Sequence, residues 1–238
     1  MRSKRTARKR LAPEESETVV RRPRHHRLAL GIVAGLLAVV GVVVAVAALR
    51  IAGDIAEQND LAAFYEQPAD ALDGDPGTIV RSEALLGVPF DARAWRIMYR
   101  TTDLNGQSVV ATGIIVTPLG PAPTDGRTVL AWGHPTTGTA PECAPSRALD
   151  PYELIEGMRL LLDRGYTITA TDYVGMGTAG PDSYLVGATG GNAILDAVRA
   201  AQQLPGAEAS DRVVLWGHSQ GGQAVVFAAQ RAPEYAPE

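Results

Sequence analysis

The first clear pattern along the chain is an uncharged, apolar run at residues 28–49, bracketed by Arg27 and Arg50. As a helix, this run would rise about 33 Å, which is enough to cross the hydrocarbon core of a membrane. Ten Lys and Arg side chains precede it, and basic flanks of this kind stay in the cytoplasm. We therefore expect a basic cytoplasmic segment at 1–27, a single-pass membrane anchor at 28–49, and an extracytoplasmic domain after it.

A cleaved signal peptide is the alternative interpretation of the same run. Ala45-Val46-Ala47 resembles a cleavage site, and cleavage there would give a secreted protein. The apolar regions of cleaved signals usually have about 7–15 residues, which is shorter than this run. The sequence therefore favours the anchor and leaves secretion as the alternative.

The pattern changes after the apolar run. In residues 50–77 the apolar residues show no sustained periodic spacing, and proline and glycine interrupt the segment, as at Pro76-Gly77. This pattern predicts a stalk or linker. Strand signals begin at 78–80. The segments 94–101 and 109–116 then flank Asn105-Gly106, a pair that suits a tight hairpin turn. The folded domain is therefore expected to begin at residue 78 with antiparallel strands.

Three short apolar strands then alternate with helical patterns. The strands are expected at 128–132, 166–171 and 212–216, and the helices at about 154–165, 192–201 and 220–230, with Asn192 as the cap of the middle helix. Such alternation predicts an α/β fold in which a mainly parallel sheet is flanked by helices and the hairpin forms one edge.

Charge separates the two parts of the chain. Residues 1–50 carry eleven Lys and Arg and three Glu, a net charge of about +8, whereas residues 51–238 carry about −12. An acidic domain gives no reason to expect nucleic-acid binding. Cys143 is the single cysteine of the sequence, and no CxxC or His/Cys cluster suggests a metal site.

The motif with the clearest chemistry is Gly217-His218-Ser219-Gln220-Gly221, which matches the G-x-S-x-G pattern of a nucleophile elbow. A strand pattern leads into it and a helix pattern leads out, as an elbow requires. Ser219 is therefore the candidate nucleophile, because the strained turn lifts its hydroxyl above the sheet. Gly217 and Gly221 leave room for the neighbouring strand and helix backbones.

A nucleophilic serine also needs N–H donors for the oxyanion that forms when it attacks a carbonyl group. The backbone N–H of Gln220, at the start of the helix, is one expected donor. The second is expected from the loop at 134–138, which follows a strand. Pro135 has no N–H, so Thr136 or Thr137 is the candidate there.

Three other polar residues lie close to these segments. In proteins with a G-x-S-x-G elbow, the histidine that acts as base follows the nucleophile along the chain. Neither His134 nor His218 is therefore expected to be the base. We expect His134 to orient the loop at 134–138 and His218 to pack beside the strand ends. Asp172 is expected to cap the turn at 172–177.

Several segments, taken together, resemble the secretory lipases of yeasts and actinobacteria, a family of the α/β-hydrolase superfamily. They cover nearly all of residues 64–238 in order and comprise Phe64-Tyr65, Pro76-Gly77-Thr78, Tyr99-Arg100-Thr101-Thr102, Trp132-Gly133-His134-Pro135-Thr136-Thr137-Gly138, Cys143-Ala144-Pro145-Ser146, Thr171-Asp172-Tyr173-Val174-Gly175-Met176-Gly177 and the elbow with Gly222. The resemblance implies an α/β-hydrolase fold and hydrolysis of lipid esters, as by a triacylglycerol lipase or esterase, without a cofactor. It implies an acyl-enzyme on Ser219 and backbone donors at Gln220 and at Thr136 or Thr137.

The resemblance also implies a later cysteine that pairs with Cys143, and a triad Asp and His after Ser219, none of which this sequence supplies. We therefore expect residues 78–238 to be the N-terminal part of a hydrolase domain, truncated before the triad Asp and His and inactive by itself. Three functions stay open: ester hydrolysis, acyl transfer to an alcohol in envelope lipid assembly, and a non-catalytic, membrane-tethered binding domain.

Overall fold

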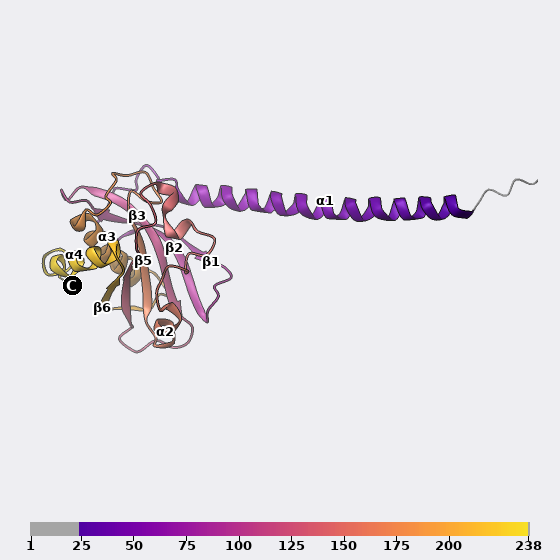
Figure 1. The fold of residues 1–238 in the computed structure, drawn as a ribbon. Helices are drawn as coiled ribbons and strands as arrows, with labels where there is room; N and C mark the ends of the chain where they lie inside the picture. The colour runs from indigo at the N-terminus through magenta and orange to yellow at the C-terminus, as the bar shows by residue number, and fades with distance from the viewer. Residues whose placement is uncertain (1–23, 238) are drawn as a thin grey trace, which may run out of the picture. The chain divides into compact units, whose positions relative to one another are not determined.

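The computed structural model describes residues 24–237, which fall into two units divided between Ala56 and Glu57. The second, from Glu57 onward, is called the compact unit below. Helix α1 (Arg24–Tyr65) contains a stretch, Ala29–Arg50, that is long and apolar enough to cross a membrane (Figure 1). A signal sequence near an N-terminus would pass the same test. Most of the basic segment expected at 1–27 lies outside the described residues.

The second unit begins at Glu57, within the segment that was expected to be a stalk at 50–77. Arg81 donates hydrogen bonds to the carbonyl groups of Ala63 and Phe64, at the end of α1. A small apolar cluster is buried there, made of Phe64, Tyr65, Ala71, Met98 and Val110. The last turn of α1 and the residues after it therefore belong to the core of this unit, because their apolar side chains pack against the sheet.

The compact unit contains one mixed sheet (Figure 1). Its six strands have the order β1-β2-β3-β5-β4-β6. Their bounds are β1 (Ile79–Leu85), β2 (Ala92–Thr102), β3 (Ser108–Pro118), β4 (Arg127–Gly133), β5 (Thr167–Val174) and β6 (Ala209–Gly217). The first three strands are antiparallel, as the hairpin pattern predicts, and β5 runs antiparallel to β3. Strand β4 pairs in parallel with both β5 and β6, so the carboxyl ends of these three strands meet at one edge of the sheet.

Helices cover both faces of the sheet. Helices α3 (Gly187–Gln203) and α4 (Gln220–Tyr235) pack on one face, in contact with β4, β5 and β6. Helix α2 (Met158–Asp163) packs on the other, against β3 and β5. The 3₁₀ turns η1 (Pro141–Cys143) and η2 (Pro145–Arg147) lie between β4 and α2 along the chain. Alternate residues of β4 enter separate apolar clusters, with Leu130 on the α2 side and Val129 on the α3 side, as the pleat of a strand requires.

Two helix starts differ from the sequence prediction. Helix α2 begins at Met158, later than expected, because Gly157 before it adopts a left-handed φ of 72°. Helix α3 begins at Gly187, so the prediction that Asn192 caps it was wrong. The Asn192 side chain instead donates to Thr102 and accepts a hydrogen bond from Arg231.

Backbone atoms of β4, β6 and α4 meet in direct contact at the parallel end of the sheet. A Cβ atom added to Gly221 would lie 1.8 Å from the carbonyl oxygen of Gly133. A Cβ atom added to Gly217 would lie 2.3 Å from the Gly221 oxygen. The N–H of His218 donates to the same Gly133 oxygen over 3.1 Å. No side chain fits at Gly217 or Gly221, so glycine is required by space at both positions.

A second feature of the core is the buried carboxylate of Asp172, which is 1% exposed. It accepts hydrogen bonds from the Thr112 hydroxyl at 2.5 Å, from the Ser146 N–H at 2.9 Å and from the Ser146 hydroxyl. The Tyr65 hydroxyl lies 2.6 Å from that of Ser146. Asp172 therefore joins β3, β5, η2 and the end of α1, and the prediction that it caps the turn at 172–177 was wrong.

We expect Gly221→Ala to destabilise the compact unit by about 1–3 kcal/mol, the usual cost of overpacking, because the new methyl group would overlap the Gly133 carbonyl. Gly222→Ala is the matched control, since its Cβ would lie 3.5 Å from the nearest atom, and we expect it to be neutral or mildly stabilising. Urea unfolding of the detergent-solubilised chain, followed by tryptophan fluorescence, measures both. Equal effects of the two substitutions would contradict the close backbone contact.

Burial raises the pKa of Asp172 above its ordinary value of 3.8, although the hydrogen bonds from Ser146 and Thr112 oppose the shift. The folded state thus holds the proton more tightly than the unfolded chain. The contribution of Asp172 to stability is present below a pH of about 3.8 and is lost as the pH rises through the folded pKa.

We therefore expect the free energy of unfolding of Asp172→Asn to fall less steeply than that of the wild type as the pH rises above about 4. Burial also raises the pKa of Asp196, so part of the decline should remain. Urea unfolding at several pH values measures the slope. Asp211→Asn, at an exposed position of β6, is the control and should keep the wild-type slope. An unchanged slope in Asp172→Asn would contradict the raised pKa.

Candidate active site

The predicted nucleophile, Ser219, lies between the end of β6 and the start of α4. Its backbone adopts φ 54° and ψ −114°, a conformation that residues other than glycine rarely adopt. The N–H of Gly221 donates to the His218 carbonyl at 2.8 Å, and the N–H of Gln223 donates to the Ser219 carbonyl at 3.2 Å. Ser219 itself is exposed. A strained serine is thus presented at the edge where the three parallel strands end.

The loop at 134–138 follows β4, the strand that pairs with β6, and therefore begins next to the elbow. Neither Thr136 nor Thr137 donates its N–H to a backbone carbonyl among the loop and turn hydrogen bonds of residues 24–237. Gln220 is the first residue of α4, and the first N–H groups of a helix have no partner within the helix. The three predicted donors are therefore on neighbouring segments, and a helix N-terminus favours negative charge there.

Side chains hold the outer part of this loop. The Thr137 hydroxyl donates to the Cys143 carbonyl at 2.9 Å, and the Thr136 hydroxyl lies 3.2 Å from that of Tyr184. Gly138 has a φ of 132°, and a Cβ there would lie 2.4 Å from the Cys143 sulfur. Cys143, whose thiol is free, therefore packs directly against the loop.

His134 lies inside the protein and is 2% exposed. Its Nδ1 lies 2.6 Å from the carbonyl oxygen of Pro135, which requires that Nδ1 carry the proton. Burial lowers the pKa of His134, although the Pro135 carbonyl and the charge of Asp172 oppose this. The imidazole is therefore neutral and tied to its own loop, in keeping with the expected orienting role.

His218 is half-exposed and forms a contact that the sequence did not indicate. Its Nδ1 lies 2.6 Å from a carboxylate oxygen of Glu156, in the segment just before α2. Glu156 lies 62 positions away along the chain, in a segment where only a helix was expected, so no local pattern could have identified it. This contact joins the elbow to the segment before α2, although both side chains are more than half exposed to water.

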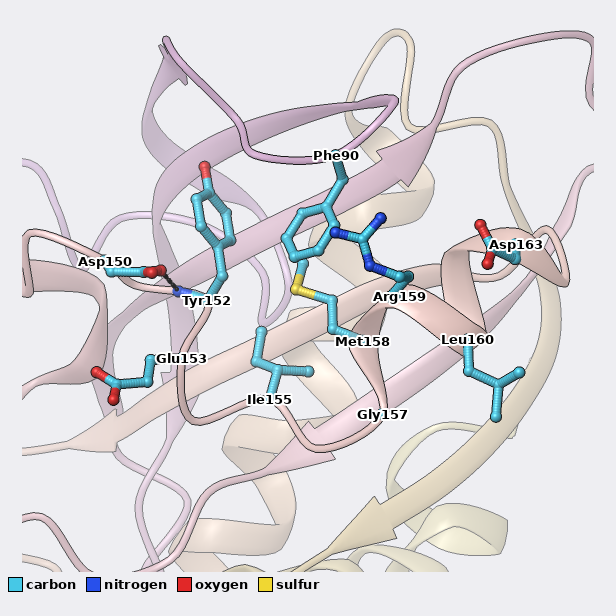
Figure 2. Close-up of a pocket in the computed structure, with 10 residues that line it drawn as sticks. All are labelled: Phe90, Asp150, Tyr152, Glu153, Ile155, Gly157, Met158, Arg159, Leu160 and Asp163. Carbon is cyan, nitrogen blue, oxygen red and sulfur yellow. Dashed lines mark hydrogen bonds between the residues drawn. The ribbon is translucent and has the colours of Figure 1, made fainter.

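An open pocket of about 580 Å³ lies beside the same segment, on the side of α2. Figure 2 shows its apolar side chains converging, with the Phe90 ring edge-on to Tyr152 and the Arg159 guanidinium 5.1 Å from the centre of the Phe90 ring. Ile155 and Met158 lie beneath them, and acidic side chains such as Glu153 surround them. The volume of this pocket lies in the range of small-molecule sites. The sequence analysis did not predict the pocket.

The structure thus brings Gly217, Ser219, Gln220 and Gly221 together with the loop that contains Thr136 and Thr137. Among residues 24–237, no group of three or more His, Cys, Asp or Glu side chains could hold a metal ion. The arrangement combines an exposed serine with backbone donors, the elements needed to attack a carbonyl group and to stabilise the oxyanion.

Residues 152–238 match the family model described as "Secretory lipase". Lipase A of Arthroderma benhamiae is 32% identical over 199 residues, which cover 74% of this chain and 41% of the relative. A Mycobacterium tuberculosis protein whose name reads "Probable inactive lipase MT1628" is 29% identical over 191 residues, which cover 74% of this chain and 42% of the relative. The chain thus spans about two fifths of the length of these relatives.

Solved structures agree with the sequence relatives. Candida antarctica lipase A in its closed state superposes with a TM-score of 0.60 at 27% identity, covering 73% of this chain and 42% of that one. The esterase LipA of Xanthomonas oryzae gives a TM-score of 0.57 at 24% identity, covering 69% of this chain and 48% of that one, which supports the fold alone. The compact unit has an α/β-hydrolase fold, and the chain belongs to the secretory lipase family.

Proposed function

We propose that Ser219 is the nucleophile of a carboxylic-ester hydrolase that acts on lipid-like acyl esters. The observation that carries the proposal is the backbone of Ser219, which has a positive φ where β6 meets α4. Such strain costs about 1–3 kcal/mol and gathers at functional sites. A turn with only a structural role would be formed at lower cost by glycine, as it is at many positive-φ positions of this chain.

In the proposed reaction, the Ser219 hydroxyl oxygen bonds to the ester carbonyl carbon while its proton passes to a base. The N–H of Gln220 and that of Thr136 or Thr137 donate to the oxygen that becomes negative. The alcohol then leaves with a proton, and an acyl-enzyme remains on Ser219. Water attacks the acyl carbon in the same way, which releases the acid and restores the serine.

The reaction requires a base, and neither histidine of the compact unit suits that role. The imidazole of His134 is buried and tied to Pro135. His218 precedes Ser219, whereas the histidine base of an α/β-hydrolase follows the nucleophile along the chain. We therefore assign no base among residues 24–237. Residues 1–238 by themselves are proposed to hydrolyse esters at least ~10³-fold more slowly than a hydrolase with a complete triad, since a serine without its histidine loses most of its rate.

The substrate class rests on the family. The relatives are named lipases. These names describe those proteins, and this chain covers about two fifths of the first relatives. Lipid-like esters are therefore the proposed substrates here, with no cofactor in the reaction as written.

We also propose that α1 crosses a membrane at 28–49 and holds the compact unit outside the cytoplasm. The apolar stretch Ala29–Arg50, the basic residues before it and membership of a secretory family support this arrangement. Secretion after cleavage near Ala47 is the alternative. Mass spectrometry of the mature N-terminus distinguishes the two.

A non-catalytic role is the second candidate, because one relative carries the name of an inactive lipase. On that proposal the chain keeps the fold and the strained elbow and binds a lipid-like ester without turning it over. If this second proposal holds, the protein as its gene encodes it will be folded and will not react with a serine-directed probe.

We expect a fluorophosphonate probe to label the protein as its gene encodes it, and Ser219→Ala to abolish the labelling, because the probe bonds to an activated serine hydroxyl. Ser82→Ala, at an exposed position of β1, is the matched control and should label like the wild type. Gel fluorescence measures the labelling, and p-nitrophenyl ester hydrolysis should fall in parallel. Labelling that survives Ser219→Ala would assign the nucleophile elsewhere, and an unlabelled, folded wild type would favour the non-catalytic role.

A further inference from the structure

A second strained residue lies near the proposed active site. Tyr173 follows Asp172 near the end of β5 and has a φ of 69°. Only four residues other than glycine have a positive φ among those that the structure describes: Tyr173, Leu185, Glu208 and Ser219. For a bulky aromatic residue this conformation is an outlier, and such strain persists only where the surrounding structure enforces it.

The structure enforces the conformation of Tyr173 from both sides. Its N–H donates to the Thr171 hydroxyl at 3.0 Å, and that hydroxyl accepts a hydrogen bond from Tyr99 at 2.6 Å. On the other side, the Ser183 hydroxyl donates to the Val174 carbonyl at 2.6 Å. The Asp172 carboxylate, held by Ser146 and Thr112, fixes the preceding residue. The backbone at this position is therefore held in one arrangement.

The side chain of Tyr173 reaches the start of the loop at 134–138. Its hydroxyl donates to the His134 carbonyl at 3.1 Å, and its ring centre lies 4.5 Å from that of the His134 imidazole. A Cβ atom added to Gly133 would lie 3.1 Å from the same hydroxyl. Tyr173 is 3% exposed, so these contacts are made away from water.

The hydrogen bond of the His134 side chain stays within the loop, whereas the hydrogen bond of its carbonyl group comes from Tyr173. Its Nδ1 bonds to the next residue, Pro135, and its Nε2 is buried without a hydrogen-bond partner in the structure. The Tyr173 hydroxyl and ring are therefore contacts through which β5 holds His134, in addition to the pairing of Gly133 with Thr171. His134 lies two residues before Thr136. The direction of the His134 carbonyl group therefore helps to determine the positions of the backbone N–H groups of Thr136 and Thr137.

We propose that Tyr173 is a positioning residue that holds the oxyanion loop at 134–138 through His134. The strained backbone of Tyr173 places its hydroxyl within hydrogen-bonding distance of the His134 carbonyl. The consequence for catalysis rests on the proposed function, whereas the consequence for the loop does not. Loop position and ester turnover are therefore measured separately.

Hydrogen exchange of the detergent-solubilised chain, read by mass spectrometry, tests the position of the loop. In Tyr173→Phe we expect the peptide that contains residues 133–138 to exchange roughly fivefold faster, the scale of one neutral hydrogen bond. Peptides from β1 to β3 should exchange as in the wild type, and the urea midpoint should change little. Tyr166→Phe, just before the other end of β5, is the matched control and should leave the loop unchanged.

Ester hydrolysis by the protein as its gene encodes it supplies the second measurement. We expect Tyr173→Phe to lower kcat roughly fivefold with KM nearly unchanged. A displaced N–H donor would stabilise the transition state less and would leave the binding of the ester unchanged.

Unchanged loop exchange would overturn the proposal, as would faster exchange spread evenly over the compact unit, which would indicate a general loss of stability. Faster exchange confined to the loop supports the proposal even where no turnover is measured, and in that case only the proposed function fails. A fall in kcat without any change in the loop would show that Tyr173 acts by another route, and it would overturn the positioning role.

Discussion

The candidate site depends on one contact, the direct approach of the first turn of α4 to the end of β4. No side chain fits between Gly221 and the Gly133 carbonyl. Because the two backbones touch, the free N–H at the start of α4 and the loop that follows β4 come to lie at the same edge of the sheet. A larger residue at Gly221 would separate the two proposed sources of oxyanion donors, even if each segment kept its own conformation.

This arrangement carries costs that the rest of the unit must offset. Ser219 and Tyr173 hold positive φ values, and Asp172 is a carboxylate with almost no contact with water. Each feature alone disfavours the folded state. The offset comes from apolar clusters on both faces of the sheet and from the full set of donors around Asp172. Asp172 and Tyr173 therefore occur where buried clusters surround them, whereas Ser219 is held by the backbone contacts of the elbow.

The sequence predicted the features whose cause is local. Alternating and β-branched residues located the strands, Asn105-Gly106 located the hairpin turn, and the glycines around Ser219 located the elbow. Each of these signals lies within a few residues of the element that it specifies. The prediction of a sheet with an antiparallel edge and flanking helices followed from the order of such signals along the chain.

The features that the sequence analysis missed depend on partners far along the chain. Asp172 reads as a turn cap from its neighbours, but its hydrogen bonds come from Thr112, 60 positions away, and Ser146, 26 positions away. Asn192 reads as a helix cap, but its partners are Thr102 and Arg231. The contact of His218 with Glu156 and the packing of Phe64 also depend on residues far along the chain. Local chemistry cannot distinguish a polar residue that ends an element from one that joins two elements.

The candidate site also separates two requirements of serine catalysis. The strained serine and the backbone donors proposed for it lie at strand ends and at a helix start, so folding alone would preorganise them. A proton acceptor is a side chain, and it can be present or absent without any change in the elbow or the loop. An α/β-hydrolase can therefore keep a complete oxyanion site whether or not it catalyses a reaction. For this reason the geometry of Ser219 and Tyr173 supports a carbonyl-binding site more directly than it supports a rate of turnover.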